Sequence, residues 1–555
     1  MPSITVSYHD LCNLLGKTIE LDRLCERLGM LGMEAEAAEK EIKIEIAHNR
    51  PDLLSVEGVA RALRGFLRIE TGLPQYKVRP SSISLEVDQS VETIRPYIAA
   101  GVVSGVKLTD DIIASLMQAQ EKLHASLCRK RSKGSIGIYD LHTITPPVRY
   151  TTTLPDGVRF VPLDFGRELS PAEILRQHPK GIEYGSTIQG LPRYPLLIDS
   201  RGTVLSMPPI INSEDTRVTE KTKGFFIDVT GQDDRVINHV LTVIMTSLAE
   251  RGFSLETVAI KYPEKRATTP KLRPRKLRLN ISNVNKIIGI DLSPQQIAKL
   301  VKVMRYGVDK IRKDILTLLV PPYRCDIMHE IDVIEDVAIG YGYDNLEPTL
   351  PKVLTMGERA AIEKISDRAR RVLTGLNFME VMTYTLTNPR INFDLMRLKG
   401  EAVEIANPIS EEFTIVRDSL IPSLLSVLRE NRHNPLPHKI FEVGDVVVLD
   451  QSLENGAKNV RRAAAAIAGE GFGFTYMKAV AEALLRELGN QWELKPSWHP
   501  SFIDGRVAEF LTNGKELGIV GELHPEVITG FELEHPVVVF EIDLAEKFIP
   551  DLPNP

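Results

Sequence analysis

The pattern of apolar and polar positions in residues 1–75 predicts a small module of mixed helix and strand. Apolar residues at helical spacing predict a first helix, which would stop at Gly29 because glycine often follows a helix C-terminus; they are Leu21, Leu24, Cys25 and Leu28. A second helix is predicted after HNRPDLLS (48–55), where Pro51 can occupy the first helical turn. Its apolar stripe runs over residues 56–67.

Residues 76–262 alternate short strand-like runs with turns and are predicted to form an α+β domain. Helical stretches are expected at 111–127 and near 236–250. Residues 263–278 follow, with three prolines, seven basic residues and one acid. This composition is typical of an exposed basic linker, and a strip that contacts phosphates is the alternative.

Residues 279–350 predict a compact helix-rich module. Ser293 and Gln296 have the spacing of a capping box, with Pro294 at the first helical position. A strand is predicted at 314–324 and an acidic helix at 329–342. In residues 351–555, helices separated by β-rich runs such as KIFEVGDVVVL and VVVFEIDL predict an antiparallel sheet with flanking helices, and EVMTYTL (380–386) reads as a further strand.

Composition narrows the class of protein. The 555 residues are 43% hydrophobic and 26% charged, which is ordinary for globular domains and excludes disorder or coiled coil for most of the chain. No apolar run approaches the roughly 20 residues needed to cross a bilayer, and the N-terminus lacks the pattern of a secretory signal. Four scattered cysteines without a CxxC pair fit a reducing cytoplasm. A net charge of −6 argues against general coating of nucleic acid but leaves a local basic patch open.

Four acids near one predicted helix are the most informative local chemistry: Asp326, Asp332, Glu335 and Asp336. Helical spacings of three and four place the last three on one face. Oxygen ligands of this kind suit Mg²⁺, and a two-metal phosphoesterase could use them. A solvated acidic helix face is the alternative interpretation.

Several strings, in order, together resemble the beta subunit of phenylalanine–tRNA ligase in its archaeal and eukaryotic cytosolic form. They are HNRPDLLSVEGVARALRGF (48–66), VLSMPPIIN (204–212), FIDVTG (226–231), PPYRCDIMHEIDVIEDVAIGYGYDNL (321–346), NPISEEFTIVRDSLIPSLL (407–425) and KIFEVGDV (439–446). The resemblance implies a tetramer of two alpha and two beta subunits that binds phenylalanine tRNA and uses ATP and Mg²⁺. In this family the alpha subunit activates phenylalanine, while the beta subunit provides architecture, tRNA contacts and hydrolysis of mischarged tyrosyl-tRNA.

The resemblance assigns the editing site to residues 76–262 and to four side chains: Ser206, Asn212, Asp228 and Thr230. Asp228 and Thr230 would point to one face of a strand, while Ser206 and Asn212 bracket a proline loop. The alternative is that Asn212 and Asp228 only satisfy turn backbone. The chain departs from the family pattern at Tyr139, where a histidine is expected, and at His142, where an acid is expected. If the expected histidine helps to bind substrate, its replacement by Tyr139 could weaken or retune editing. His124 and Arg129 match the family and are assigned to the RNA end, and a solvated loop is the alternative for the basic run RKRSK (129–133).

The same resemblance assigns a structural magnesium to Asp326, Asp332, Glu335 and Asp336, in a helix-rich metal-binding module (279–350). It also describes residues 351–555 as a class II synthetase-like antiparallel sheet domain without catalytic residues. The predicted strand Phe441–Val446 lacks the arginine that grips ATP, so the chain alone is expected not to activate an amino acid. Two alternatives stay open: an RNA-binding assembly scaffold with a decayed editing site, and a metal-dependent phosphoesterase.

Overall fold

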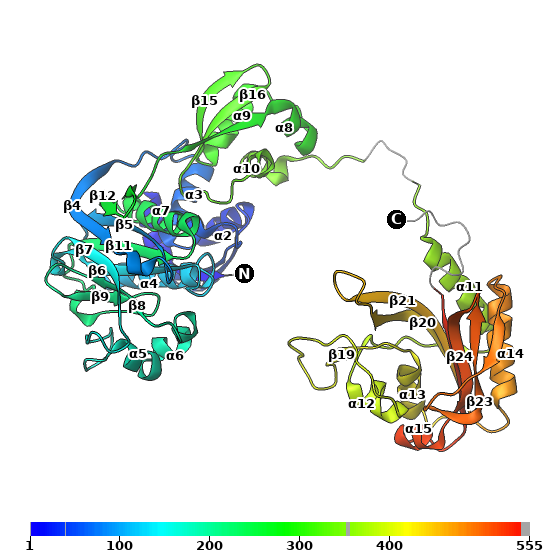
Figure 1. The fold of residues 1–555 in the computed structure, drawn as a ribbon. Helices are drawn as coiled ribbons and strands as arrows, with labels where there is room; N and C mark the ends of the chain where they lie inside the picture. Colours follow the sequence, from blue (N-terminus) through cyan, green and yellow to red (C-terminus); the bar gives the residue numbers. More distant parts are fainter. Residues whose placement is uncertain (1, 39, 351–355, 545–555) are drawn as a thin grey trace. The chain divides into compact units, whose positions relative to one another are not determined.

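The computed structural model describes residues 2–38, 40–350 and 356–544, and the chain forms two compact units, Met1–Thr349 and Leu350–Pro555 (Figure 1). Both are of the α+β class, as predicted. Among the described residues, no helix combines the length and apolar character that crossing a lipid bilayer would require.

The first unit begins with the predicted mixed module. A three-stranded antiparallel sheet has the order β1 (Ser3–Ser7), β3 (Glu41–Glu45), β2 (Glu34–Ala38). It is accompanied by α1 (Tyr8–Leu15), α2 (Leu21–Met30) and α3 (Val56–Phe66). The predicted end of the first helix is wrong, whereas the second helix follows residues 48–55 as predicted but does not start at Pro51. Helix α2 continues through Gly29, and the left-handed turn falls on Gly32. Pro51 starts a short 3-10 turn, while the Ser55 hydroxyl caps α3 by accepting from Gly58 N.

A large mixed sheet follows. Its strand order is β10 (Ile211–Asn212), β9 (Val204–Met207), β8 (Tyr194–Ile198), β7 (Val148–Thr153), β4 (Val78–Val87), β12 (Ser254–Lys261), β5 (Tyr97–Ser104), β11 (Gly224–Gly231), β6 (Gly134–Asp140). The β12–β4 and β4–β7 pairs are parallel and the other pairs along this path are antiparallel. Helix α7 (Asp234–Glu250) packs on β5 and β11, close to the predicted helix at 236–250. Helices α4 (Asp110–Ala125), α5 (Pro171–Gln177) and α6 (Pro179–Tyr184) complete this part.

The segment 263–278 is more ordered than an exposed linker. Residues 266–269 form β13 (Arg266–Thr269), which pairs with β12, and the Thr269 side chain is buried. The segment ends in β14 (Arg275–Asn280), the edge of a sheet with the order β14, β16 (Ile315–Val320), β15 (Gly307–Arg312). The basic side chains between these strands stay exposed. Charge and proline content did not predict the two strands, because they do not reveal a neighbouring strand edge.

The remainder of the first unit contains α8 (Ile281–Ile288), α9 (Pro294–Val303) and α10 (Glu330–Tyr341). The predicted capping box is present: Ser293 Oγ accepts from Gln296 N at 3.3 Å, and Gln296 Oε1 accepts from Ser293 N at 2.8 Å. One apolar core joins the N-terminal module, α7 and this helical part; it includes Leu63, Leu248 and Val301.

The second unit is built on a seven-stranded sheet: β17 (Met379–Glu380), β20 (His438–Leu449), β21 (Ala457–Ala468), β25 (Val537–Asp543), β24 (Lys515–Leu523), β23 (Phe502–Thr512), β22 (Glu493–Pro496). It is antiparallel as predicted, apart from the β17–β20 pair. Alternate strand residues bury against two sets of helices. One core contains α11 (Ala361–Gly375) and α14 (Phe474–Glu487), and the other contains α13 (Ile421–Glu430) and α15 (Pro525–Gly530).

The strand predicted at 380–386 is wrong for most of its length. Only Met379–Glu380 (β17) and Leu386–Thr387 (β18) pair, the latter with β19 (Ile415–Val416). Met382 and Tyr384, the residues that suggested a strand, are largely exposed, so the alternation there does not mark burial.

Candidate functional site

The large mixed sheet curves until its two ends meet. Strands β6 and β9 lie near opposite ends of the hydrogen-bonded order, yet Tyr139 Oη of β6 lies 2.8 Å from Ser206 Oγ of β9. This closure brings together residues that are far apart in the sequence.

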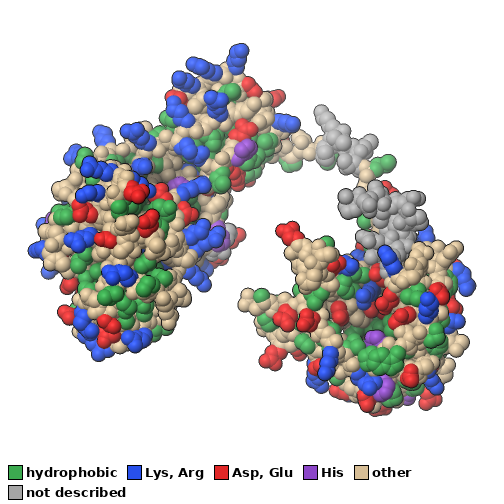
Figure 2. All heavy atoms as spheres, viewed as in Figure 1, with side chains coloured by type: hydrophobic (Ala, Val, Ile, Leu, Met, Phe, Trp, Pro, Cys, Tyr) green, Lys and Arg blue, Asp and Glu red, His purple; other side chains and the backbone are tan. Residues whose placement is uncertain are grey.

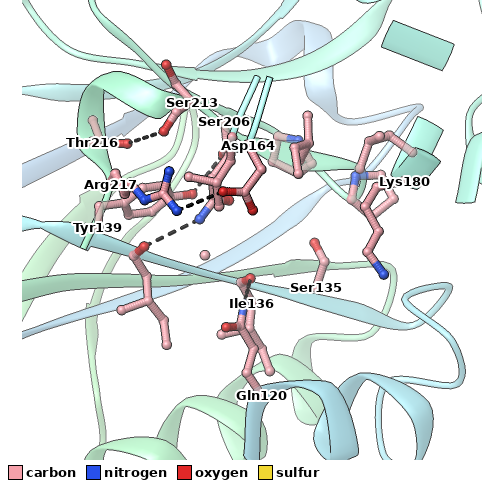
Figure 3. Close-up of a pocket in the computed structure, with 18 of the residues that line it drawn as sticks. Gln120, Ser135, Ile136, Tyr139, Asp164, Lys180, Ser206, Ser213, Thr216 and Arg217 are labelled. Carbon is pink, nitrogen blue, oxygen red and sulfur yellow. Dashed lines mark hydrogen bonds and ion pairs between the residues drawn. The ribbon is translucent and has the colours of Figure 1, made fainter. Parts of the chain in front are cut away.

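A cavity of about 700 Å³ opens where the ends meet (Figure 3). Ser206, Asn212 and Asp228, three of the four predicted editing residues, line it together with Tyr139. Much of the wall is apolar: Ile113, Met117, Ile136, Ile138, Phe165 and Ile210. Lys180 lies across the cavity from Tyr139 in the view of Figure 3. The cavity therefore combines an apolar wall with one polar, buried end, as a binding site for an amphipathic small group requires.

Asp228 is the centre of the polar end. It lies on β11 between β5 and β6, directly opposite Gly137, and its side chain is 1% exposed. Burial raises the pKa of this carboxyl to about 7, against a hydrogen bond from Tyr139 that lowers it. A methyl group on Gly137 would lie 2.4 Å from Asp228 Oδ1 and 2.0 Å from Tyr139 Oη, so only glycine fits there. The carboxyl is thus poised to change its charge near neutral pH.

Tyr139, the departure from the family pattern, is part of this centre. Its hydroxyl donates to Asp228 Oδ1 at 2.6 Å and shares a hydrogen bond with Ser206 Oγ. Its ring stacks on Phe226 with centroids 6.0 Å apart. The side chain is 1% exposed, and burial beside Asp228 raises the pKa of the phenol well above its usual value, so the phenol stays neutral. His142, the second departure, is exposed and does not line the cavity.

Ser206 and Asn212 face each other in the β9–β10 hairpin, which contains the predicted proline loop. Ser206 is 2% exposed, and Asn212 Nδ2 donates to Ile138 O at 3.4 Å. The hairpin register therefore explains why these two residues, six positions apart, reach the same cavity.

Thr230 does not line the cavity. It is fully buried, with Oγ1 3.0 Å from Arg95 Nε and 3.0 Å from Ser135 Oγ. Ser135 does line the cavity, so Thr230 can only position its neighbour. The sequence places Thr230 on the same strand face as Asp228, but it did not predict that the Thr230 hydroxyl accepts a hydrogen bond from Arg95.

His124 is placed as a structural group. It is 2% exposed, and its Nε2 accepts from Ile136 N at 2.9 Å. Burial lowers its pKa to about 4, so the ring is neutral. His124 is therefore buried and Arg129 is exposed, and the assignment of both to the RNA end stays a prediction.

Sequence reasoning missed several groups in the cavity wall. Arg131 is 8% exposed, donates to Ile210 O at 2.9 Å and pairs with Glu121 at 2.8 Å. Gln120 Nε2 donates to Ile136 O at 2.8 Å. Arg131 lies in a basic run that resembles a solvated loop, and Gln120 lies on an amphipathic helix, so neither carried a signal.

The four acids assigned to magnesium are not brought together. Asp326 and Asp336 both bind Arg324 Nη2, at 2.7 and 2.8 Å. Asp332 Oδ2 accepts from Met328 N and His329 N at 2.7 Å, which caps α10. Glu335 is exposed. In the part of the chain that the structure describes, no three His, Cys, Asp or Glu side chains are arranged to hold an ion. The residues therefore do not fit the metal as placed, and the phosphoesterase alternative loses its site.

Three arginines of the second unit lie outside the predicted strand Phe441–Val446, and each forms an ion pair with a carboxylate. Arg417 is 2% exposed and lies 2.8 Å from Glu442 Oε1. On β21, Arg461 binds Asp445 at 2.6 Å and Arg462 binds Glu541 at 2.9 Å. These cations serve internal ion pairs, so none of the three offers a free charge to a triphosphate.

Comparison with known proteins gives three family matches along the chain. Residues 1–68 match the "Phe-tRNA synthetase beta subunit B1 domain", residues 277–343 the "tRNA synthetase B5 domain" and residues 346–544 the "Phenylalanyl tRNA synthetase beta chain CLM domain". The phenylalanine–tRNA ligase beta subunit of Archaeoglobus fulgidus is 44% identical over 553 residues, covering 99% of each chain. That of Pyrococcus abyssi is 40% identical over 558 residues, covering 99% of this chain and 100% of the relative.

A solved structure resembles the first unit. An N-terminal fragment of the phenylalanyl-tRNA synthetase beta subunit from Pyrococcus horikoshii is 39% identical, with a TM-score of 0.59, and covers 61% of this chain and 99% of the fragment.

Proposed function

Because the chain belongs to the family of phenylalanine–tRNA ligase beta subunits, we propose that it works with an alpha subunit, in a cytoplasmic tetramer of two alpha and two beta chains. The assembled ligase would use ATP and Mg²⁺ to attach phenylalanine to its tRNA. The proposal assigns no metal to the four acids at 326–336. Asp326 and Asp336 pair with Arg324, Asp332 caps α10, and Glu335 is exposed to solvent.

Within that complex, we propose that the first cavity hydrolyses tyrosyl-tRNA. The observation that supports this most is a buried carboxyl, Asp228, at the polar end of an otherwise apolar cavity of about 700 Å³. An apolar pocket for phenylalanine rejects an added hydroxyl by only about 10², whereas a site that hydrogen-bonds the hydroxyl rejects phenylalanine far more strongly. Asp228 Oδ1 accepts a hydrogen bond from the Tyr139 hydroxyl, and its second oxygen can accept a hydrogen bond from the phenol of a bound tyrosyl group.

The chemistry requires only a positioned water. The water attacks the ester carbonyl, the bond from that carbon to the ribose oxygen breaks, and tyrosine and tRNA leave with the water's hydroxyl and proton respectively. Asn212 and Ser206 line the cavity and could hold the ester and the water in the reactive geometry. Thr230 would act through Ser135 and is a positioning residue in this proposal.

Substituting Asp228→Ala tests the proposal. In the complex of alpha and beta subunits, we expect deacylation of tyrosyl-tRNA to slow by about tenfold to a hundredfold, which corresponds to one hydrogen bond with a charged group. Attachment of phenylalanine should not change. Asp199→Ala is the control, because Asp199 is also a buried carboxyl of the first unit, in the turn that follows β8, but does not line the cavity. Equal deacylation by wild type and Asp228→Ala would remove Asp228 from the reaction.

A second candidate function is supported by one observation. The Tyr139 hydroxyl already hydrogen-bonds Asp228, the group proposed to read a substrate hydroxyl, and Ser206, one of the groups proposed to position the ester and the water. This is expected of an RNA-binding assembly scaffold whose editing site has decayed. A wild-type complex that charges tRNA but leaves tyrosyl-tRNA intact would favour this alternative.

A further inference from the structure

A second cavity, of about 620 Å³, lies in the first unit and shares no lining residue with the first. One wall is the start of α7, and another is the segment 271–275 that leads into β14. The third wall is residues 321–328, which include Pro321, Pro322, Ile327 and Met328.

The lining is strongly basic. Arg235, Lys271, Arg273 and Arg275 line it, against a single acid, Asp234. All four basic side chains are exposed, and Asp234 Oδ1 accepts from Asn238 Nδ2 at 3.1 Å. Across the described residues, no ion pair involves Arg235, Lys271 or Arg273. Arg324, the remaining lining arginine, is neutralised by Asp326 and Asp336.

The positive field is strong enough to act on a neighbouring group. His239 also lines the cavity, and its pKa is lowered first by burial and then by the charges of Arg235 and Arg275. The chain as a whole carries a net charge of −6, so this cavity is a local positive site on an acidic protein.

We propose that this second cavity binds the sugar–phosphate backbone of RNA, namely the tRNA of the ligase; the identity of that RNA rests on the proposed function. Lys271, Arg273 and Arg275 are alternate residues of one segment, so they repeat positive charge along a line as phosphates repeat negative charge along a strand. One guanidinium group can donate two parallel hydrogen bonds to two oxygens of the same phosphate. Pro322, which is half-buried in the lining, supplies apolar surface on which a ribose can lie.

The basic residues on β15 provide the matched comparison. Figure 2 shows Lys and Arg side chains gathered where β15 and β16 lie in the first unit. Lys310 and Arg312 on β15 are exposed but do not line the cavity. Replacing either pair by glutamate changes the net charge of the chain equally.

The experiment measures the affinity of the full chain for fluorescent phenylalanine tRNA over a range of salt concentrations. The double variant K271E/R273E should bind at least tenfold more weakly near physiological salt. Its slope of log affinity against log salt should be shallower by about 1.5, since each lost phosphate contact accounts for roughly 0.7–0.9. The double variant K310E/R312E should stay within threefold of wild type.

Three outcomes would overturn the proposal. If both double variants lost the same affinity for tRNA, binding would depend on the overall positive charge of the surface and not on this cavity. Unchanged binding by K271E/R273E would exclude the cavity from RNA contact. Labelled polyglutamate that bound as tightly as tRNA, and was lost in the same variant, would indicate an acidic protein partner. Deacylation at saturating tRNA should be normal in K271E/R273E, so a failed editing proposal and a failed cavity proposal give different results.

Discussion

At the scale of single residues, Asp228 and Tyr139 form a buried acid–phenol pair at the end of the first cavity. The sequence marked both positions, one as a predicted site residue and the other as a departure from the family pattern. It could not predict that they touch, because Ser206 and Tyr139 meet only after the sheet has curved through most of its strands. Gly137 leaves room for both side chains, but no sequence motif marked it as a residue of the site.

The raised pKa of Asp228 predicts a pH dependence of stability. The unfolded chain releases this proton near 3.8 and the folded chain near 7, so the folded state holds more protons between these values. The free energy of unfolding therefore falls as pH rises from about 4 to about 7, by up to about 4 kcal/mol. Asp228→Asn stays neutral and should lack this contribution.

Urea unfolding of wild type and Asp228→Asn at pH 5 and at pH 8 measures the effect. Other groups titrate alike in both proteins, so the difference between them isolates Asp228. Parallel stability curves across this range would contradict the assignment of the proton to Asp228.

At the scale of elements, helix α10 shows how spacing can mislead. The acids at 332, 335 and 336 have the predicted helical spacing, but their surroundings give each a different task. Asp336 is 3% exposed and also accepts from Tyr306 Oη at 2.5 Å, while Asp332 caps the helix. A pattern of like charges specifies a face of a helix; the partner that approaches that face, here Arg324, comes from another segment.

Substituting Asp336→Asn should lower the free energy of unfolding by about 3–5 kcal/mol, because it leaves Arg324 buried with one partner fewer. The loss should be the same in EDTA and in millimolar Mg²⁺. Glu335→Gln, on the exposed side of the same helix, should change stability by less than about 0.5 kcal/mol. If Mg²⁺ stabilised wild type and either substitution abolished that effect, a metal site would have to be restored to this helix.

Elements with strong local signals were predicted well. The capping box at Ser293 and the apolar helix Asp234–Glu250 depend on neighbours within one or two turns. Failures occurred where pairing over a long distance decides the outcome, as at β13 in the predicted linker. The exposed residues near Tyr384 failed in the opposite way, because alternation without burial does not produce a strand.

At the scale of the whole molecule, the chain combines a first unit that contains both cavities with a second unit in which Arg417, Arg461 and Arg462 form internal ion pairs. The class of fold followed from the sequence because periodicity changes along the chain. The common core of the first unit did not, since it joins Leu63, Leu248 and Val301 from three segments that each read as a separate domain.

The isolated chain should give no phenylalanine-dependent exchange between ATP and pyrophosphate, because Arg417, Arg461 and Arg462 are held by carboxylates. Mixing it with an alpha subunit should produce exchange, and the two proteins should co-elute in gel filtration. Exchange by the solitary chain would contradict the assignment of activation to the alpha subunit.

The ion pairs of Arg251 have a consequence for anyone who wishes to cut this protein down to a minimal hydrolase. This largely buried arginine ends α7, yet both carboxylates that compensate it, Asp10 and Glu57, come from the first 75 residues. Removing residues 1–75 would leave the Arg251 guanidinium without either carboxylate partner. It would also expose apolar residues of α7, the helix that packs against β11, the strand that contains Asp228. Since the same apolar core also includes residues of α8, α9 and α10, we expect the shortest fragment that folds with an intact cavity to be residues 1–349.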